Sequence, residues 1–86
     1  MMIKRKWKPL TVAEWRRSEK ERIRITLHEY KGRNVIDLRT WWEDQTGRER
    51  AGRHGITLDV SHTAKLAKGF KRALVKARKA GLIDEE

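Results

Sequence analysis

Hydrophobic and polar residues alternate along residues 22–30, which is the spacing that places apolar side chains on one face of a β-strand. Ile23, Ile25 and Leu27 share one face. The residues on the other face are Arg22, Arg24, Thr26 and His28. The pattern therefore predicts a half-buried strand with a cationic outer face.

A tight reversal and a second strand follow the first. The reversal is predicted because Gly32 and Asn34 tolerate positive φ. Residues 35–39 then alternate again, with Asp37 and Arg39 on the polar face. The sequence thus predicts a β-hairpin.

Two adjacent tryptophans, Trp41 and Trp42, end the second strand. Neighbouring residues of a strand point to opposite faces, and a β-bulge would exchange the two positions. We expect Trp41 to belong to the core. The pattern alone leaves Trp42 open between the core and an exposed, ligand-facing position.

A second turn and a long helix complete the pattern. Asp44-Gln45-Thr46-Gly47 is a turn signal, and residues 48–58 return as a strand interrupted by two glycines. Asp59 is a predicted N-cap for a helix over residues 60–80, closed by Gly81. One face of this helix is apolar. The opposite face carries a stripe of five cations: Lys65, Lys68, Arg72, Lys76 and Lys79.

The N-terminal region is predicted to lie outside the sheet. Residues 1–10 resemble a basic arm, and Thr11 with Glu14 fits a capping box that predicts a short helix from about Val12 to Glu21, with Trp15 as its apolar anchor. The expected organisation is an arm and helix over residues 1–21 and one domain over residues 22–86.

Composition points to a polyanionic partner. The 86 residues include 40% charged side chains and carry a net charge of +10, while four tryptophans argue that the chain folds. A chain of this length has a small core, so dimerisation is a predicted way of burying more apolar surface. With no cysteine and no long apolar run, we expect a soluble, intracellular protein with no membrane partner.

Three strings, YKGRNVIDLRTWW, DQTG and AGRHGITLD, occur in an order and spacing that resemble the positive cofactor four family of transcriptional coactivators. The resemblance covers roughly residues 22–75 and points to a prokaryotic or phage member. It implies an α+β fold in which a curved antiparallel sheet is followed by a long C-terminal helix. That helix would pack on the sheet and pair with its twin in a homodimer. The family binds single-stranded DNA.

By position, the resemblance assigns base stacking to Tyr30 and Trp42. The residues that it assigns to the DNA backbone are Lys31, Arg33, Arg39, Arg53 and His54. His28 occupies another DNA-binding position, where the family can carry a basic residue. Asp37 lies among these cations, so we expect it to orient Arg39 or a neighbouring cation. We expect no enzymatic activity, metal or cofactor, since no nucleophile and base pair, phosphate loop or metal-ligand spacing is present.

The expected function is sequence-independent binding of single-stranded DNA or melted duplex, with a role in transcription, replication or repair and with proteins of those processes as further partners. An RNA-binding or ribosome-associated protein and a protein adaptor in transcription are the alternatives, because charge and stacking alone do not exclude them. The expected location is the cytoplasm, with the nucleoid, in a prokaryote and the nucleus in a eukaryote.

Overall fold

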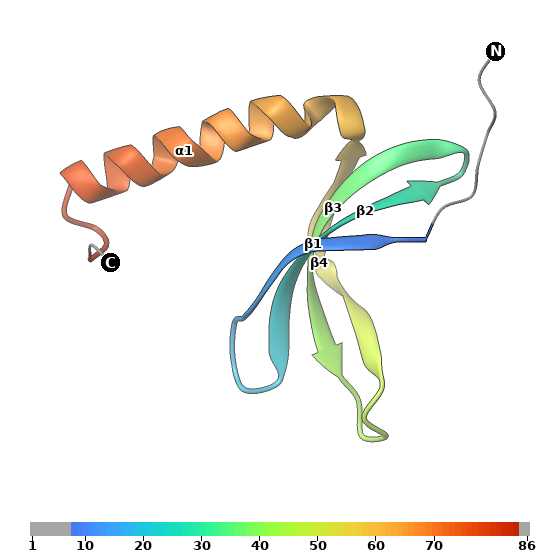
Figure 1. Cartoon of the computed structure of the whole chain (residues 1–86). Helices are drawn as coiled ribbons and strands as arrows, with labels where there is room; N and C mark the ends of the chain where they lie inside the picture. The colour runs from blue at the N-terminus through green and yellow to red at the C-terminus, as the bar shows by residue number, and fades with distance from the viewer. Residues whose placement is uncertain (1–7, 85–86) are drawn as a thin grey trace, which may run out of the picture.

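The computed structural model describes residues 8–84 and shows an α+β fold: a four-stranded antiparallel sheet followed by one helix (Figure 1). The predicted basic arm lies mostly outside the described residues. The elements are β1 (Leu10–Arg16), β2 (Glu21–Tyr30), β3 (Arg33–Glu43), β4 (Glu49–Asp59), the 3₁₀ turn η1 (Val60–His62) and α1 (Thr63–Lys79). The predicted α+β class, antiparallel sheet and C-terminal helix are confirmed.

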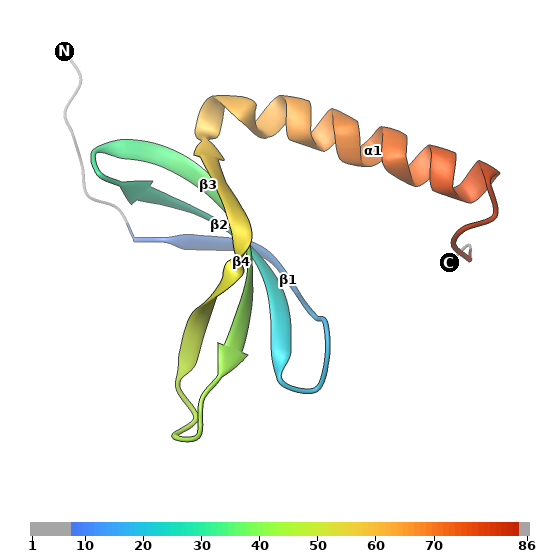
Figure 2. The same ribbon diagram turned by 180° about the vertical axis from the view of Figure 1, so that it is seen from behind.

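The strands lie in the order β1-β2-β3-β4, so each pairs with its neighbour in the sequence. The β2–β3 ladder runs without interruption from Tyr30 opposite Arg33 to Trp42 opposite Glu21. Lys31 and Gly32 make the reversal, with φ of 52° and 79°. The sheet is strongly twisted, and its two ends diverge in Figures 1 and 2. This twist is the usual right-handed twist of strands, accumulated over long hairpins.

The register sorts the side chains onto two faces. We call the face that includes Arg24, His28, Tyr30, Asp37, Arg39 and Trp41 the polar face. The opposite, apolar face includes Trp15, Ile23, Ile25, Leu27, Ile36, Leu38, Trp42, Ile56 and Leu58. Alternation in β2 and β3 predicted this division correctly.

The helix predicted from Val12 to Glu21 is wrong, because residues 10–16 form strand β1 instead. Glu14, expected to close a capping box, pairs with Arg24 of β2, and Trp15 lies opposite Ile23 on the apolar face. A capping box is a local signal, whereas pairing with β2 supplies a ladder of backbone hydrogen bonds along residues 10–16. The sheet therefore begins at Leu10, within the region that the sequence assigned to an arm and helix.

The two glycines of β4 mark an irregularity in its pairing with β3. Arg39 lies opposite Gly55 and Trp41 opposite Ala51, so β4 has two more residues than β3 between these pairs. A Cβ on Gly55 would lie 2.7 Å from the carbonyl oxygen of Leu38, and one on Gly52 would lie 2.9 Å from that of Thr40. Only glycine permits this close approach of the two strands.

The C-terminal helix ends as predicted, but it does not begin as predicted: residues 60–62 form the 3₁₀ turn η1, and α1 begins only at Thr63. The Asp59 carboxylate accepts a hydrogen bond from the Ser61 amide at 3.0 Å, which caps η1 ahead of α1. The helix closes at Gly81, with φ of 72°. Leu66 and Phe70, in the first two turns, line a small hollow over the apolar face. The rest of α1 extends away from the sheet (Figure 2), so within one chain the expected packing of the helix on the sheet is limited to its start.

The core of a single chain is small. Val35, 6% exposed, is the only buried hydrophobic residue among residues 8–84. Phe70 is 53% exposed and Trp15 51% exposed. The apolar face also carries a hollow of about 490 Å³ between β1, β4 and α1. One chain therefore leaves much of its apolar surface uncovered.

Asp44 organises the tip of the β3–β4 hairpin. Its carboxylate accepts hydrogen bonds from the amides of Thr46 and Arg48 at 2.9 and 3.0 Å, from the Thr46 hydroxyl at 2.6 Å and from Arg50 Nε at 2.9 Å. The Thr46 hydroxyl first, and then Arg50, hold the pKa of Asp44 well below its ordinary value of 3.8. The charged carboxylate is thus the form that stabilises the turn.

We predict that Asp44→Ala lowers the melting temperature at pH 7 and that this loss shrinks as the pH falls below about 4. The folded pKa lies below the unfolded one, so the contribution is complete above the unfolded value of 3.8 and disappears as the pH falls towards the folded one. Thermal unfolding at pH 7 and pH 3 checks this, with Asp84→Ala, in the exposed C-terminal tail, as the control. A loss of equal size at both pH values would contradict the prediction.

Candidate nucleic-acid interface

The polar face of the sheet is hollowed into a groove of about 690 Å³. All four strands contribute to it, because the twist of the sheet makes this side concave. Its chemically distinctive lining residues are Arg24, His28, Tyr30, Asp37, Arg39 and Trp41. Two aromatic rings, two guanidinium groups and an imidazole therefore share one concave surface.

Asp37 fixes Arg39 at the centre of the groove. The Asp37 carboxylate, 4% exposed as a residue, accepts from Arg39 Nε at 3.1 and 3.2 Å and from Nη2 at 2.9 Å. It also accepts from the Thr57 hydroxyl at 2.6 Å. Arg39 Nη1 donates to the carbonyl oxygens of Gly52 and Arg53 at 3.2 and 3.4 Å. The structure thus shows the orienting contact that we expected of Asp37.

Arg24 lies over Trp41 at the side of the groove nearest β1. Its guanidinium carbon is 4.4 Å from the centroid of the indole, which is a cation–π contact. Arg24 also donates to Glu14 at 2.6 Å and to Glu49 at 2.8 Å. Burial opposes the charged form of Arg24, but the hydrogen bonds with Glu49 and Glu14 outweigh it and raise the pKa. Arg24 therefore stays charged and ties β1, β2 and β4 together.

Glu49 is the second carboxylate of this network. It accepts from Arg22 at 2.9 Å as well as from Arg24, and the hydrogen bond from Arg24 is the main cause that lowers its pKa. The sequence pattern placed Arg22 and Arg24 on the cationic outer face of this strand. The structure shows them paired with carboxylates, which leaves less of their charge for a ligand.

The β2–β3 hairpin gathers four of the predicted site residues. Tyr30 is 53% exposed, and Lys31 Nζ lies 5.2 Å from the centroid of its ring. Arg33 lies opposite Tyr30 in the register and is exposed. His28 lines the groove beside them, with Nδ1 3.4 Å from the Thr26 hydroxyl. This end of the groove therefore presents an accessible ring among cationic and ionisable side chains.

The two tryptophans occupy the opposite faces that alternation requires, but Trp41 is not the core residue we expected. It is half-buried under Arg24 and lines the groove. Trp42, 45% exposed, belongs by register to the apolar face, at the far end of the β2–β3 ladder from Tyr30. Alternation from Asp37 and Arg39 would have placed Trp41 on the polar face, so the signal was present in the sequence.

The remaining two predicted residues lie in the irregular part of β4. Arg53 is exposed, and its carbonyl oxygen accepts from Arg39. His54 lines the hollow of the apolar face together with Trp15 and Ile56. The structure thus brings His28, Tyr30 and Arg39 together in the groove, with Lys31 and Arg33 at its hairpin end and Arg53 beside it. It places Trp42 and His54 elsewhere.

Two further properties hold for residues 8–84. No helix among them is long and apolar enough to cross a membrane. In the same part of the chain, no three His, Asp or Glu side chains are grouped so that they could hold a metal ion.

A small α+β domain with aromatic rings and cations in a concave sheet has the kind of surface that nucleic-acid-binding domains use. The chain belongs to the Transcriptional Coactivator p15 (PC4) family, whose model matches residues 15–69. The match begins in β1 and ends in α1, so it includes every strand of the sheet in whole or in part. The resemblance seen in the sequence is thereby confirmed.

Solved structures agree with this assignment. A PC4 homologue from Burkholderia pseudomallei is 32% identical, with a TM-score of 0.66 over 73% of this chain and 85% of that one. The MoSub1 protein, solved in complex with DNA, is 26% identical, with a TM-score of 0.60 over 86% and 90% of the two chains. A bacteriophage T5 homologue of PC4 shares the fold at 20% identity, with a TM-score of 0.65 over 83% and 80%.

We predict that Asp37→Asn lowers the free energy of unfolding by about 2 to 3 kcal/mol, the scale of hydrogen bonds to a charged group. The amide cannot accept all the donors that Arg39 and Thr57 present, and Arg39 is left without its counter-charge. Urea unfolding checks this, with Glu43→Gln, an exposed carboxylate of the same strand, as the control. Equal stability of the two variants would show that the Asp37 network does not hold β3 to β4.

Proposed function

We propose that this protein binds single-stranded DNA without reading its sequence, through the groove of the polar face, and that it does so as a homodimer. The observation that carries the proposal is the groove itself, in which exposed or half-exposed rings alternate with cations. Single-strand binding needs these two kinds of group: rings on which unpaired bases stack and cations that follow the phosphates. The net charge of +10 favours any polyanion and adds long-range attraction.

At the hairpin end of the groove, Tyr30 offers its ring to a base. More than half of the residue is exposed, so its ring is accessible to a base. Lys31 and Arg33 flank the ring and can contact the phosphates on either side of the stacked base. His28, one position further along the same face, adds a donor inside the groove.

Arg39 provides a charge in the middle of the groove whose position is already fixed. Because Asp37 and two carbonyl groups hold the guanidinium, little side-chain entropy is lost when a phosphate approaches it. Asp37 offsets part of this charge, so Arg39 acts mainly by position. Arg53, exposed on the neighbouring strand, supplies an additional cation beside it.

Trp42 is proposed as the second stacking residue, beyond the far end of the groove. About 30 Å separate Arg33 from Trp42 along β3, at about 3.3 Å per residue. The twist rotates the faces of the sheet over that length. A DNA strand that runs along β3 can therefore pass from the polar face at Arg33 to the face that carries Trp42. Trp42 is nearly half exposed and lies opposite Arg50, which again pairs a ring with a cation. His54 is proposed as a contact at the rim, from β4.

Stacking is also what favours single strands over duplex. In a duplex the faces of the bases are covered by their neighbours, so Tyr30 and Trp42 have nothing to stack on. The proposed substrates are therefore single strands and melted duplex, as they arise in transcription, replication or repair. The MoSub1 complex with DNA supports DNA as the ligand, and the phage T5 homologue is implicated in recombination-dependent DNA replication.

The homodimer is proposed because one chain cannot cover its own apolar surface. Trp15, Ile56, Phe70 and Leu74 are each at least two-fifths exposed, and they lie on the apolar sheet face and the apolar side of α1. A contiguous exposed apolar patch of this kind marks an interaction surface in most proteins. A second copy supplies a matching helix and sheet and leaves the polar face free.

We predict that Tyr30→Ala weakens binding of a dT oligonucleotide of about 20 nucleotides by about 1 to 3 kcal/mol, the value of one stacked base. Trp42→Ala is expected to cost a similar amount. Tyr30→Phe, which keeps the ring, is the matched control and should bind as the wild type does. Fluorescence anisotropy across a salt series measures the affinities.

Two results would contradict the proposed single-strand site. One is a Tyr30→Ala protein that binds the oligonucleotide as tightly as Tyr30→Phe. The other is a duplex competitor that displaces the oligonucleotide as well as unlabelled dT does. An RNA oligonucleotide of matched length that competes better than DNA would favour the RNA-binding alternative instead.

For the dimer, we predict that Phe70→Lys converts the protein to a monomer or a weakly associating species. The ammonium group of a lysine at this position would be buried against the second copy without a carboxylate to pair with. Val75→Lys makes the same change on the other side of α1 and should leave the dimer intact. Light scattering after gel filtration gives the masses, and far-UV circular dichroism shows whether the variants fold. A wild-type protein that is monomeric at micromolar concentration would refute the dimer.

A further inference from the structure

Helix α1 carries more positive charge than the proposed dimer contact needs. Its 17 residues, Thr63–Lys79, contain seven Lys and Arg and no Asp or Glu. We call five of them the basic stripe: Lys65, Lys68, Arg72, Lys76 and Lys79. None of these five forms an ion pair with any residue in the described part of the chain, whereas Arg22, Arg24 and Arg39 of the sheet are all paired.

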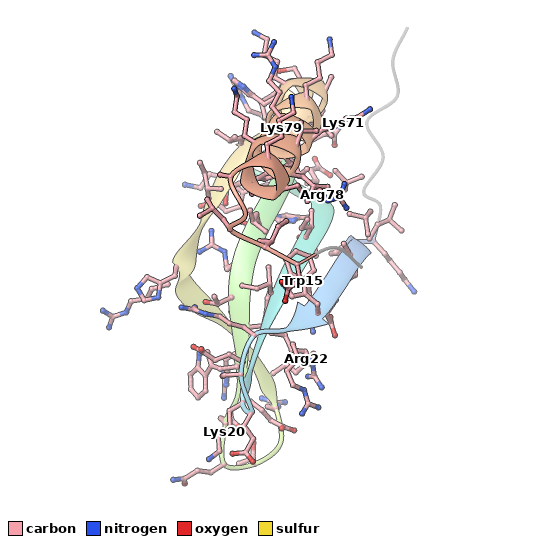
Figure 3. The ribbon with its side chains drawn as sticks, turned by 90° about the vertical axis from the view of Figure 1, so that its left-hand side faces the viewer. Trp15, Lys20, Arg22, Lys71, Arg78 and Lys79 are labelled. Carbon is pink, nitrogen blue, oxygen red and sulfur yellow. The ribbon has the colours of Figure 1, made fainter. Side chains whose placement is uncertain are left out.

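The basic stripe is straight and faces away from the apolar surface. At 100° per residue its five side chains fall within about 80° of the helix circumference, opposite Leu66, Phe70 and Ala77. It is about 21 Å long, at 1.5 Å per residue. In Figure 3, which looks along α1, most cationic side chains of the helix project away from the sheet, and Lys79 of the stripe is labelled. A second copy bound to the apolar face therefore leaves the stripe exposed.

The chemistry of the stripe differs from that of the groove. A shallow depression runs between its side chains, lined by Lys68, Lys71, Arg72, Val75, Lys76 and Lys79. It contains no aromatic ring, so it can contact phosphates but cannot stack bases. Duplex DNA is the polyanion that presents phosphates along a stiff rod and keeps its bases inside. The stripe matches that ligand, whereas the groove matches an unpaired strand.

An acidic protein partner fits the stripe less well. Stable protein interfaces are built around buried aromatic, aliphatic or Arg anchors, with charges at the rim. Among the residues that line the depression only Val75 is apolar, and Lys, which predominates there, is depleted at protein interfaces. A row of lysines is instead typical of surfaces that neutralise a phosphate backbone.

We propose that the basic stripe of α1 binds the sugar-phosphate backbone of duplex DNA without reading its sequence. The protein would then hold a junction, with the unpaired strand in the groove and the flanking duplex along α1. This inference deepens the proposed function and rests on it for the single-stranded arm. The binding of duplex can be tested separately.

The test compares two triple variants that remove the same charge. The stripe variant is Lys68→Gln, Arg72→Gln and Lys76→Gln, since glutamine keeps most of the helix propensity of the residues it replaces. The control variant is Arg16→Gln, Arg17→Gln and Lys20→Gln, at the turn between β1 and β2. Circular dichroism and gel filtration establish that both keep the wild-type fold and assembly.

Affinities are measured against three ligands over a salt series: a duplex of about 20 base pairs, a dT strand of about 20 nucleotides, and a junction of the two. For duplex, the slope of log K against log salt should fall by about 0.9 for each phosphate that the variant no longer neutralises, hence by up to about 3 in the stripe variant. The control variant should keep the wild-type slope for duplex. With the dT strand, the stripe variant should keep the wild-type slope.

The junction tests whether the two surfaces act together. The wild type should bind the junction more tightly than it binds the duplex or the dT strand alone, and the stripe variant should bind the junction no better than it binds the dT strand.

The proposal is overturned if the stripe and control variants bind duplex equally well, or if the stripe variant loses affinity for the dT strand as severely as for the duplex. It is also overturned if duplex binding is unchanged while binding to poly-glutamate disappears, since the stripe would then serve an acidic protein. A different result would contradict the proposed single-strand site: Tyr30→Ala would bind the dT strand with wild-type affinity, whatever the affinity of the stripe variant for duplex.

Discussion

The separation of two faces by the alternation of β2 and β3 is the constraint on which the rest of the structure depends. Ile23, Ile25 and Leu27 of β2 and Ile36 and Leu38 of β3 alternate with mostly polar residues, so those polar residues gather on the other side of the sheet. The strong twist then makes that side concave, and the cations and rings meet in a groove. The same alternation leaves an apolar face that one helix, attached at its start, does not cover. A groove side and an assembly side are thus consequences of one pattern, and the groove and the proposed dimer surface lie on opposite faces of the sheet. Trp42 and His54, also proposed as DNA contacts, belong by position to the apolar face.

Within the groove, the Asp37–Arg39 pair shows how a small sheet holds a charge in place with little core behind it. A buried carboxylate costs free energy unless its oxygens are hydrogen-bonded, and here three donor groups from Arg39 and Thr57 satisfy it. The glycines of β4 allow that strand to approach β3 closely enough for Arg39 to reach two of its carbonyl oxygens. The position of the charge is therefore set by backbone and side chains together. A ligand that meets Arg39 does not have to order it first.

Much of the fold could be predicted because its signals are local and strong. The alternation of residues 22–39, the turn residues at both hairpins, and Asp59 and Gly81 at the ends of the helix each specify structure within a few positions. Strand β1 was missed because Thr11 and Glu14 fit the start of a helix, whereas the pairing with β2 that makes residues 10–16 a strand is not a local signal.

The positions of Arg53 and His54 in the site could not be predicted. Two glycines indicate that β4 is irregular, but they do not show how many extra residues β4 contains. Trp41 was misjudged for a different reason: a large indole was assumed to be core, although alternation placed it on the polar face.

The most direct test of the single-strand groove is a two-dimensional ¹⁵N–¹H NMR titration of the protein with a short dT oligonucleotide, following the indole N–H signals of the tryptophans. Trp41 lines the groove, Trp42 is a proposed stacking residue, and Trp15 lies on the apolar face. We expect the indole signals of Trp41 and Trp42 to move on binding, together with the amides of the β2–β3 hairpin around Tyr30, while the Trp15 signal stays in place. Movement of Trp15 with no change at Trp41, Trp42 or the hairpin would contradict the proposed groove and place the strand on the other side of the sheet.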